Sequence, residues 1–135
     1  MANFKTLFLY QEPWEAERFE SGVGPEMEVV GFPQGTDLLE VGGGHPETVM
    51  VVGGGGVRSA EVADLFPRLQ LIQTLSAGTD TIPKVEMSER GVRVANNMGG
   101  NAVAVAEVTV ALIVSTYRRL MVQWNDTNNK GVYGA

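Results

Sequence analysis

The sequence contains no cysteine, which excludes disulfide bonds and thiolate metal sites and is compatible with a reducing compartment. It contains a single histidine, His45, whose setting in GGGHP favours a place in an exposed loop over a catalytic role. Basic residues are scarce, with 10 Lys and Arg against 16 Asp and Glu and a net charge of −6. Because nucleic-acid phosphates are bound by clustered Lys and Arg, this balance disfavours a nucleic-acid partner.

Long uncharged apolar runs are also absent. The longest apolar stretch, residues 102–117, is interrupted by Glu107, so the sequence predicts no segment that spans a membrane. The first residues, MANFKTLFLY, lack the charged start and the long apolar run of a signal peptide. Together these absences predict a cytoplasmic protein without a membrane partner.

Apolar runs alternate with helical segments along the chain. A chain of 135 residues, 44% of them hydrophobic, is long enough for one domain with its own core. Continuous apolar runs such as TVMVV indicate strands that are buried on both faces of a parallel sheet. Strands are predicted at residues 4–10, 28–32, 48–52, 69–75 and 92–95, and helices at residues 12–20, 59–66, 83–90 and 101–120.

This alternation predicts an α/β fold, because helical crossovers join parallel strands and cover both faces of the sheet. We expect a flavodoxin-like doubly wound parallel sheet of about five strands, followed by a long C-terminal crossover helix over residues 101–120. The helix is apolar around most of its circumference, so a second surface is expected to cover it, and Glu107 must face water or a partner. Residues 121–135 are polar and are predicted to form a connection.

A run of glycines, Gly53 to Gly56, lies between a predicted strand and a predicted helix, where a dinucleotide-binding loop would also lie. Three observations weigh against such a loop. The strand is the third of the chain, the next strand ends without an acidic residue, and the glycines are not spaced as G-x-G-x-x-G. The first interpretation is a tight turn beside a cleft. A loop whose backbone approaches a small ligand and a dinucleotide site are the alternatives.

Two further loops follow the predicted strands at 69–75 and 92–95, where α/β proteins bind small ligands. In the first, from Ser76 to Asp80, small residues and successive backbone N–H groups suit a carboxylate ligand. Asp80 is expected to cap the following turn rather than to act in acid–base chemistry. In the second, Asn101 stands at the start of the long helix, either as its N-cap or as a donor to a ligand.

Three segments in this order, LSAGTD, RGVRVANNMGGNAVAVAE and ALIVSTYRRL, resemble the substrate-binding domain of NAD-dependent D-isomer-specific 2-hydroxyacid dehydrogenases. The resemblance runs over residues 48–120, and residues 1–47 share only the strand–helix rhythm. It implies that residues 1–120 form the substrate-binding domain and that residues 121–135 begin the connection to an NAD-binding domain. It also implies hydride transfer between NAD or NADP and a small 2-hydroxy or 2-keto acid in the full-length parent.

The resemblance also implies the residues of the substrate site. Backbone N–H groups of Ala77 and Gly78 are expected to hold the substrate carboxylate, with Asn101 beside the substrate or the cofactor. Ala77 and Ala102 are expected next to the cofactor. Gly53 and Gly54 stand where several family members have Arg-Ser, so they are assigned to the substrate site although the arginine that can contact the substrate carboxylate is missing.

Nothing in the chain matches the catalytic Arg, Glu and His of the family, so no catalytic residue and no metal ligand is assigned. We therefore expect an N-terminal piece of a dehydrogenase that is inactive alone, binds no cofactor alone and forms a homodimer through helix 101–120. Two alternatives remain: a free-standing flavodoxin-like module that binds a small acid or a protein, and a nucleotide-binding protein that uses residues 53–56.

Overall fold

The computed structural model describes residues 4–131, with Gly54 described by its backbone alone. It divides into two compact units, the first ending at Met98 and the second beginning at Gly99. The elements of the first unit are β1 (Phe4–Tyr10), α1 (Pro13–Gly22), β2 (Met27–Pro33), α2 (Leu38–Val41), the 3₁₀ turn η1 (Gly42–Gly44), β3 (Thr48–Val52), the 3₁₀ turn η2 (Gly54–Gly56), α3 (Val62–Leu65), β4 (Leu71–Gln73), α4 (Lys84–Glu89) and β5 (Arg93–Ala95). The second unit contains α5 (Ala102–Tyr117) and α6 (Leu120–Lys130).

The five strands form one parallel sheet in the order β2-β1-β3-β4-β5. This is the order of a doubly wound flavodoxin-like sheet, in which the direction of winding reverses between β1 and β3. The predicted α/β fold with five parallel strands is therefore confirmed. Two of the strands, β1 and β3, begin and end where the sequence predicts them.

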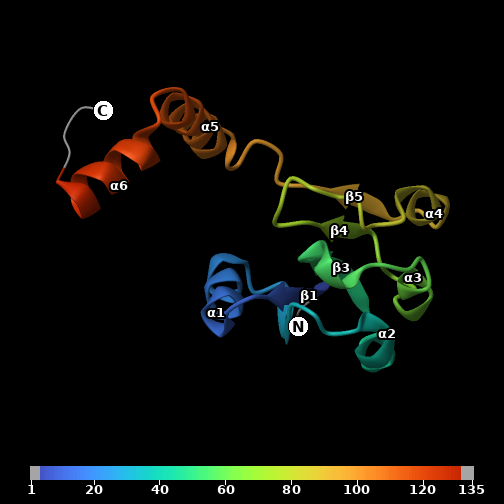
Figure 1. Ribbon diagram of the computed structural model, residues 1–135. Helices are drawn as coiled ribbons and strands as arrows, with labels where there is room; N and C mark the ends of the chain where they lie inside the picture. Colours follow the sequence, from blue (N-terminus) through green and yellow to red (C-terminus); the bar gives the residue numbers. More distant parts are fainter. Residues whose placement is uncertain (1–3, 132–135) are drawn as a thin grey trace. The chain divides into compact units, whose positions relative to one another are not determined.

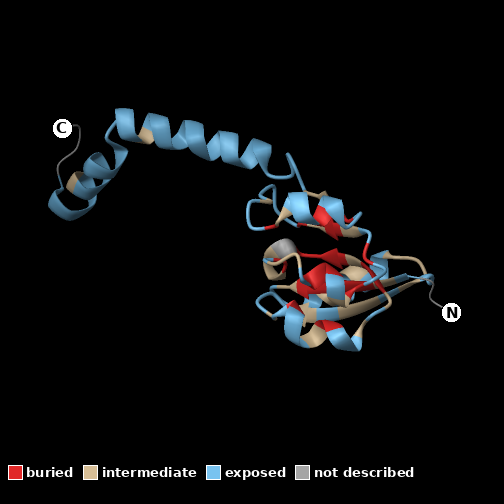
Figure 2. Cartoon of the chain, turned by 90° about the vertical axis from the view of Figure 1, so that its right-hand side faces the viewer, coloured by how far each residue is buried: buried red, intermediate tan, exposed pale blue. Residues whose placement is uncertain are grey.

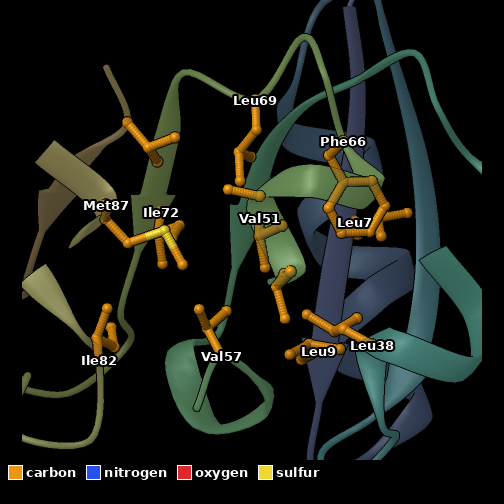
Figure 3. Close-up of a cluster of buried hydrophobic side chains, with 13 residues drawn as sticks. Leu7, Leu9, Leu38, Val51, Val57, Phe66, Leu69, Ile72, Ile82 and Met87 are labelled. Atoms are coloured by element: carbon orange, nitrogen blue, oxygen red, sulfur yellow. The ribbon is translucent and has the colours of Figure 1, made fainter. Parts of the chain in front are cut away.

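Helices cover both faces of the sheet in the first unit. Figure 1 shows α1 on one face and α2, α3 and α4 on the other. Because side chains alternate along a strand, Leu7 and Leu9 face α2 to α4, whereas Phe8 faces α1 and stacks on Phe19 with ring centroids 4.8 Å apart. The main hydrophobic cluster (Figure 3) consists of Leu7, Leu9, Leu38, Val51, Val57, Val62, Ala63, Phe66, Leu69, Ile72, Ile82, Met87 and Val92.

Local sequence signals account for several element ends. Pro13 opens α1, where its missing N–H has no helical partner to lose, and Glu15 accepts hydrogen bonds from the backbone N–H groups before it. Gly91 follows the end of α4 in a left-handed conformation, which glycine adopts readily. Helix α3 is shorter than predicted because Ser59 accepts the N–H of Glu61 in a turn before the helix begins.

The second unit corrects two expectations. The long helix ends at Tyr117 rather than at residue 120, because Arg119 adopts the left-handed conformation, with a φ of 52°. Residues 121–130, expected to belong to a polar connection, instead lie in helix α6, which begins at Leu120. The predicted connection at 132–135 lies outside the described residues. In Figure 2 both helices are almost entirely exposed, whereas the first unit contains buried residues, which include most of β1 and β3.

An ion-pair cluster joins three segments at the edge of the sheet where the strands begin. Lys5 in β1 contacts Glu28 in β2 at 3.2 Å and pairs with Glu47, which precedes β3. Hydrogen bonding to Glu47 raises the pKa of Lys5, and the same contact lowers the pKa of Glu47. The cluster ties neighbouring strands together at the edge opposite the strand ends at which doubly wound sheets bind ligands.

Within residues 4–131, no helix has both the length and the apolar character needed to cross a membrane.

Candidate functional site

A cavity of about 340 Å³ opens at the carboxyl ends of the strands in the first unit. It includes residues that follow β1 and β3, so it lies at the point where the winding of the sheet reverses. This is the place where doubly wound folds bind ligands. The volume is near the lower limit for ligand pockets and suits a small molecule. The lining residues are Leu9, Gln11, Glu15, Gln34, Gly53, Gly55, Thr74, Leu75, Ser76, Gly78 and Thr81.

One wall of the cavity is the loop after β4, and its carbonyl groups are all engaged in hydrogen bonds. The Ser76 carbonyl accepts from the Thr74 hydroxyl at 2.6 Å and from the Asn97 backbone at 3.1 Å. The Ala77 carbonyl accepts from the Asn96 side chain at 2.7 Å, and the Gly78 carbonyl accepts from the Ser76 hydroxyl at 3.3 Å. The loop therefore offers no free carbonyl oxygen over residues 76–78.

The backbone N–H groups of the same loop are open. Ser76, Ala77 and Gly78 donate no backbone hydrogen bond to any other residue in the described part of the chain. Successive unpaired N–H groups form a concavity of positive potential that binds anions. With its carbonyls bound and its N–H groups free, the loop is suited to a carboxylate.

The opposite wall comes from the segments that follow β1 and β2. Gln11 and Gln34 line the cavity, and neither carboxamide is hydrogen-bonded within residues 4–131. Glu15 of α1 also lines it, with Oε2 accepting the backbone N–H groups of Gln11 at 2.7 Å and Glu12 at 3.2 Å. Within the described part of the chain, Glu15 is the only charged residue that lines the cavity, and no Lys or Arg does so.

The structure brings together some of the predicted site residues. Gly53 and Gly78 line the cavity. Ala77 lies between the lining residues Ser76 and Gly78, and the side chain of Ala77 is exposed. Gly54 begins η2. Gly53 has a φ of +92°, and a Cβ atom there would lie 2.6 Å from the Leu9 carbonyl oxygen, so only glycine fits this position.

Asn101 and Ala102 belong to the second unit. Asn101 takes the N-cap position of α5, but its side chain makes no capping hydrogen bond. The predicted position is therefore correct, whereas the side-chain cap is not formed. Its carbonyl accepts the N–H of Val105 at 2.9 Å. Ala102 is the first residue of α5. Their predicted roles toward substrate and cofactor stay predictions.

Two other residues differ from expectation. Asp80, expected to cap the following turn, accepts no hydrogen bond within the described range and does not line the cavity. His45 lies in a loop, as predicted, but it is half-buried rather than exposed. Its ring meets the edge of Phe32 with centroids 5.6 Å apart. His45 is not among the residues that line the cavity, so neither residue supports acid–base chemistry there.

The glycine run does not fit a dinucleotide. Such a loop presents the phosphates to the N-terminus of a helix that follows directly. Here α3 begins only at Val62, contains four residues and starts beside Glu61 and Asp64, whose charges would repel a pyrophosphate. The third interpretation of residues 53–56, a nucleotide site, therefore finds no support in the geometry.

Sequence reasoning missed Gln11, Gln34 and Glu15 as lining residues and Asn96 as a support of the 76–78 loop. Three of these residues could have been found from the sequence. Gln11, Gln34 and Asn96 each follow directly after a predicted or observed parallel strand. Because parallel strands end at the same edge of a sheet, residues after the strands gather there.

Comparison with known proteins identifies a family whose sequences this chain resembles. The sequence model of the family described as D-isomer specific 2-hydroxyacid dehydrogenase, catalytic domain, matches residues 11–130. A glyoxylate reductase from Thermofilum pendens is 44% identical over 62 residues, which are 46% of this chain and 18% of that protein. The matching segment thus covers less than a fifth of that relative's length.

Two solved structures share the fold. A glyoxylate reductase from Paecilomyes thermophila matches with a TM-score of 0.73 and 19% identity, over 99% of this chain and 44% of that chain. An NAD-dependent formate dehydrogenase from Staphylococcus aureus, solved in complex with NAD, matches with a TM-score of 0.66 and 19% identity, over 97% of this chain and 43% of that chain. Since the family model covers most of the sequence, the chain belongs to the D-isomer specific 2-hydroxyacid dehydrogenase family and carries the family's catalytic domain.

Proposed function

We propose that this chain supplies the substrate site of an oxidoreductase that transfers a hydride between NAD or NADP and C2 of a small 2-hydroxy or 2-keto acid. One observation carries the proposal: a small cavity at the reversal point of the sheet, with three open backbone N–H groups at Ser76, Ala77 and Gly78. The family match and the glyoxylate reductase relative support the same substrate class.

The residues of the loop have distinct tasks in this proposal. The N–H groups of Ala77 and Gly78 bind the substrate carboxylate, and Asn96 keeps the loop in place through its bond to the Ala77 carbonyl. When bound, the nicotinamide accepts or supplies the hydride. We propose Ala77 and Ala102 as neighbours of the nicotinamide, because small side chains allow a ring to approach the backbone closely. Asn101 is proposed as a neighbour of the substrate or the cofactor.

We expect no hydride transfer from residues 1–135 alone. Among residues 4–131, the only ionisable side chain that lines the cavity is Glu15, and its carboxylate is held in the cap of α1, so it is not free to move a substrate proton. Loss of NADH absorbance with glyoxylate or hydroxypyruvate should stay at the rate of a protein-free blank. Turnover above that blank would contradict the assignment of catalysis to residues outside this sequence.

Asn96→Ala should weaken the binding of D-lactate by about three- to tenfold, because one hydrogen bond that positions the loop is lost. Titration followed by NMR, on the amide signals of Ser76 and Gly78, measures this change. Asn129→Ala, on an exposed position of α6, is the matched control and should leave the affinity unchanged. Equal affinities of the Asn96 variant and the parent chain would contradict the positioning role.

We also propose that the chain forms a homodimer through residues 101–120. Every residue of α5 is exposed except Ser115, which is half-buried, although most of the side chains are apolar. Exposed apolar patches of this kind favour association with a partner, and a second copy is the simplest one.

A further inference from the structure

The cavity has two chemically different ends. At the loop end, the N–H groups of residues 76–78 attract a negative charge. At the far end lie Gln11 and Gln34, whose carboxamides are neutral and make no hydrogen bond within residues 4–131, so each offers both a donor and an acceptor. A substrate that places its carboxylate on the loop therefore presents the rest of its carbon chain to two amides.

Gln34 is held at the cavity by local packing rather than placed there by chance. Its backbone N–H donates to the Tyr10 carbonyl at 2.6 Å, which fixes the chain as it leaves β2 beside β1. Its carboxamide lies against Gly55, where a Cβ atom would approach Nε2 to 3.1 Å and Cδ to 3.7 Å. The glycine thus leaves the space that the Gln34 side chain occupies.

Gln11 is positioned by the cap of α1. Its backbone N–H donates to Glu15 Oε2 at 2.7 Å, which holds the residue at the N-terminal end of the helix. Its side chain takes no part in this bond. The same bond keeps the Glu15 carboxylate at this end of the cavity, without a Lys or Arg among the lining residues to balance its charge. A second anionic group on a substrate would meet this carboxylate and be repelled.

We infer that Gln11 and Gln34 select 2-hydroxy and 2-keto acids whose carbon chain carries a neutral hydroxyl group beyond C2, and that Glu15 excludes acids with a second negative charge. The inference rests on the proposed function, because it takes the carboxylate to lie on the 76–78 loop. It goes further by naming the substituent at the other end. Because Gln11 and Gln34 are exposed, water satisfies their carboxamides when no ligand is bound. A hydroxyl group replaces that water as both a donor and an acceptor, whereas a methyl group displaces it and offers neither.

D-glycerate, D-lactate and D-malate test this directly, because they carry a hydroxymethyl, a methyl and a carboxymethyl group on the same 2-hydroxy acid. NMR titration of the 135-residue chain should give an affinity for D-glycerate about tenfold above that for D-lactate, with D-malate the weakest. The side-chain amide signals of Gln11 and Gln34 should shift with D-glycerate and stay unchanged with D-lactate.

Variants separate the contributions of these residues. The double variant Gln11→Leu and Gln34→Leu should bind D-glycerate and D-lactate with equal affinity. Glu15→Gln keeps an acceptor for the α1 cap and should raise the affinity for D-malate towards that for the other two acids. Gln70→Leu is the matched control, since Gln70 is exposed just before β4, at the edge of the sheet opposite the cavity, and should keep the preference. Amide spectra of each variant establish that the fold is retained.

The outcomes distinguish the two proposals. If the parent chain binds D-glycerate and D-lactate equally, or if the double variant keeps the preference, the selective role of the glutamines is wrong while the carboxylate site stands. If none of the three acids shifts the signals of Ser76 to Gly78, the proposed substrate site is wrong and the selectivity falls with it.

Discussion

Gly53→Ala should lower the free energy of unfolding by about 2–5 kcal/mol, from the strain of a left-handed residue and the overpacking of a buried site. Gly53 has a φ of +92°, a conformation that costs any residue with a Cβ atom. The added carbon would also lie 2.6 Å from the Leu9 carbonyl oxygen and 2.9 Å from the Leu9 Cβ atom. Neither atom can move without shifting β1, which is hydrogen-bonded to strands on both sides.

Urea unfolding measures this loss, and Gly43→Ala is the control. Gly43 belongs to another short glycine run, η1, but has no atom within 4 Å of a built Cβ and no positive φ. Its replacement should change the free energy of unfolding by no more than about 0.5 kcal/mol. A Gly53 variant as stable as the control would show that β1 adapts and that the glycine is not required.

The geometry at Gly53 also bears on the arginine that the resemblance implies at this position in several family members. From the sequence alone, the glycine is interpreted as the loss of a substrate contact. In the structure the backbone passes so close to Leu9 that an arginine cannot occupy the site without rearrangement. Restoring the family residue by Gly53→Arg should therefore destabilise the chain rather than add a ligand for the carboxylate.

Most of the fold follows from short-range signals. The runs at β1 and β3 are apolar enough to be buried on both faces, so their bounds are predicted correctly. The alternation of strands and helices predicts a parallel sheet, and the order β2-β1-β3-β4-β5 comes from the structure. The predicted domain boundaries remain predictions, although the chain divides near Met98.

The C-terminal part is where local reasoning fails. LMVQWNDTNNK contains several residues with weak helix propensity, so it resembles a connection, yet it forms α6. A left-handed conformation at Arg119 separates this helix from α5, and no glycine marks the position. Non-glycine residues adopt this conformation rarely, so a sequence pattern gives little warning of it.

The candidate site is likewise predictable from the sequence only in part. The 76–78 loop is predictable because small residues directly follow a buried strand. Its hydrogen-bond pattern is not, since Asn96 and Asn97 reach it from the next strand. Gln11 and Gln34 belong to the site only through the order of the strands, which brings the ends of β1, β2 and β3 to one cavity.

The second large effect is expected on α5. Val108→Glu combined with Leu112→Glu should weaken self-association by at least about 100-fold. The two side chains are four residues apart on one helical face and are 58% and 62% exposed. Burial of such side chains contributes roughly 1.5–3 kcal/mol each, and a symmetric dimer contains every contact twice. Two carboxylates in their place would have to be buried without partners.

Sedimentation velocity over a range of concentrations measures the effect, and the control adds the same charge elsewhere. Gln70→Glu with Ser88→Glu places two carboxylates at exposed polar positions of the first unit, so net charge and long-range repulsion change equally. This control should associate as tightly as the parent chain. That result would show that the α5 variant self-associates weakly because its apolar face is changed. A parent chain that stays monomeric at the highest concentration would overturn the dimer proposal. An α5 variant that associates as tightly as the control would place the interface on another surface.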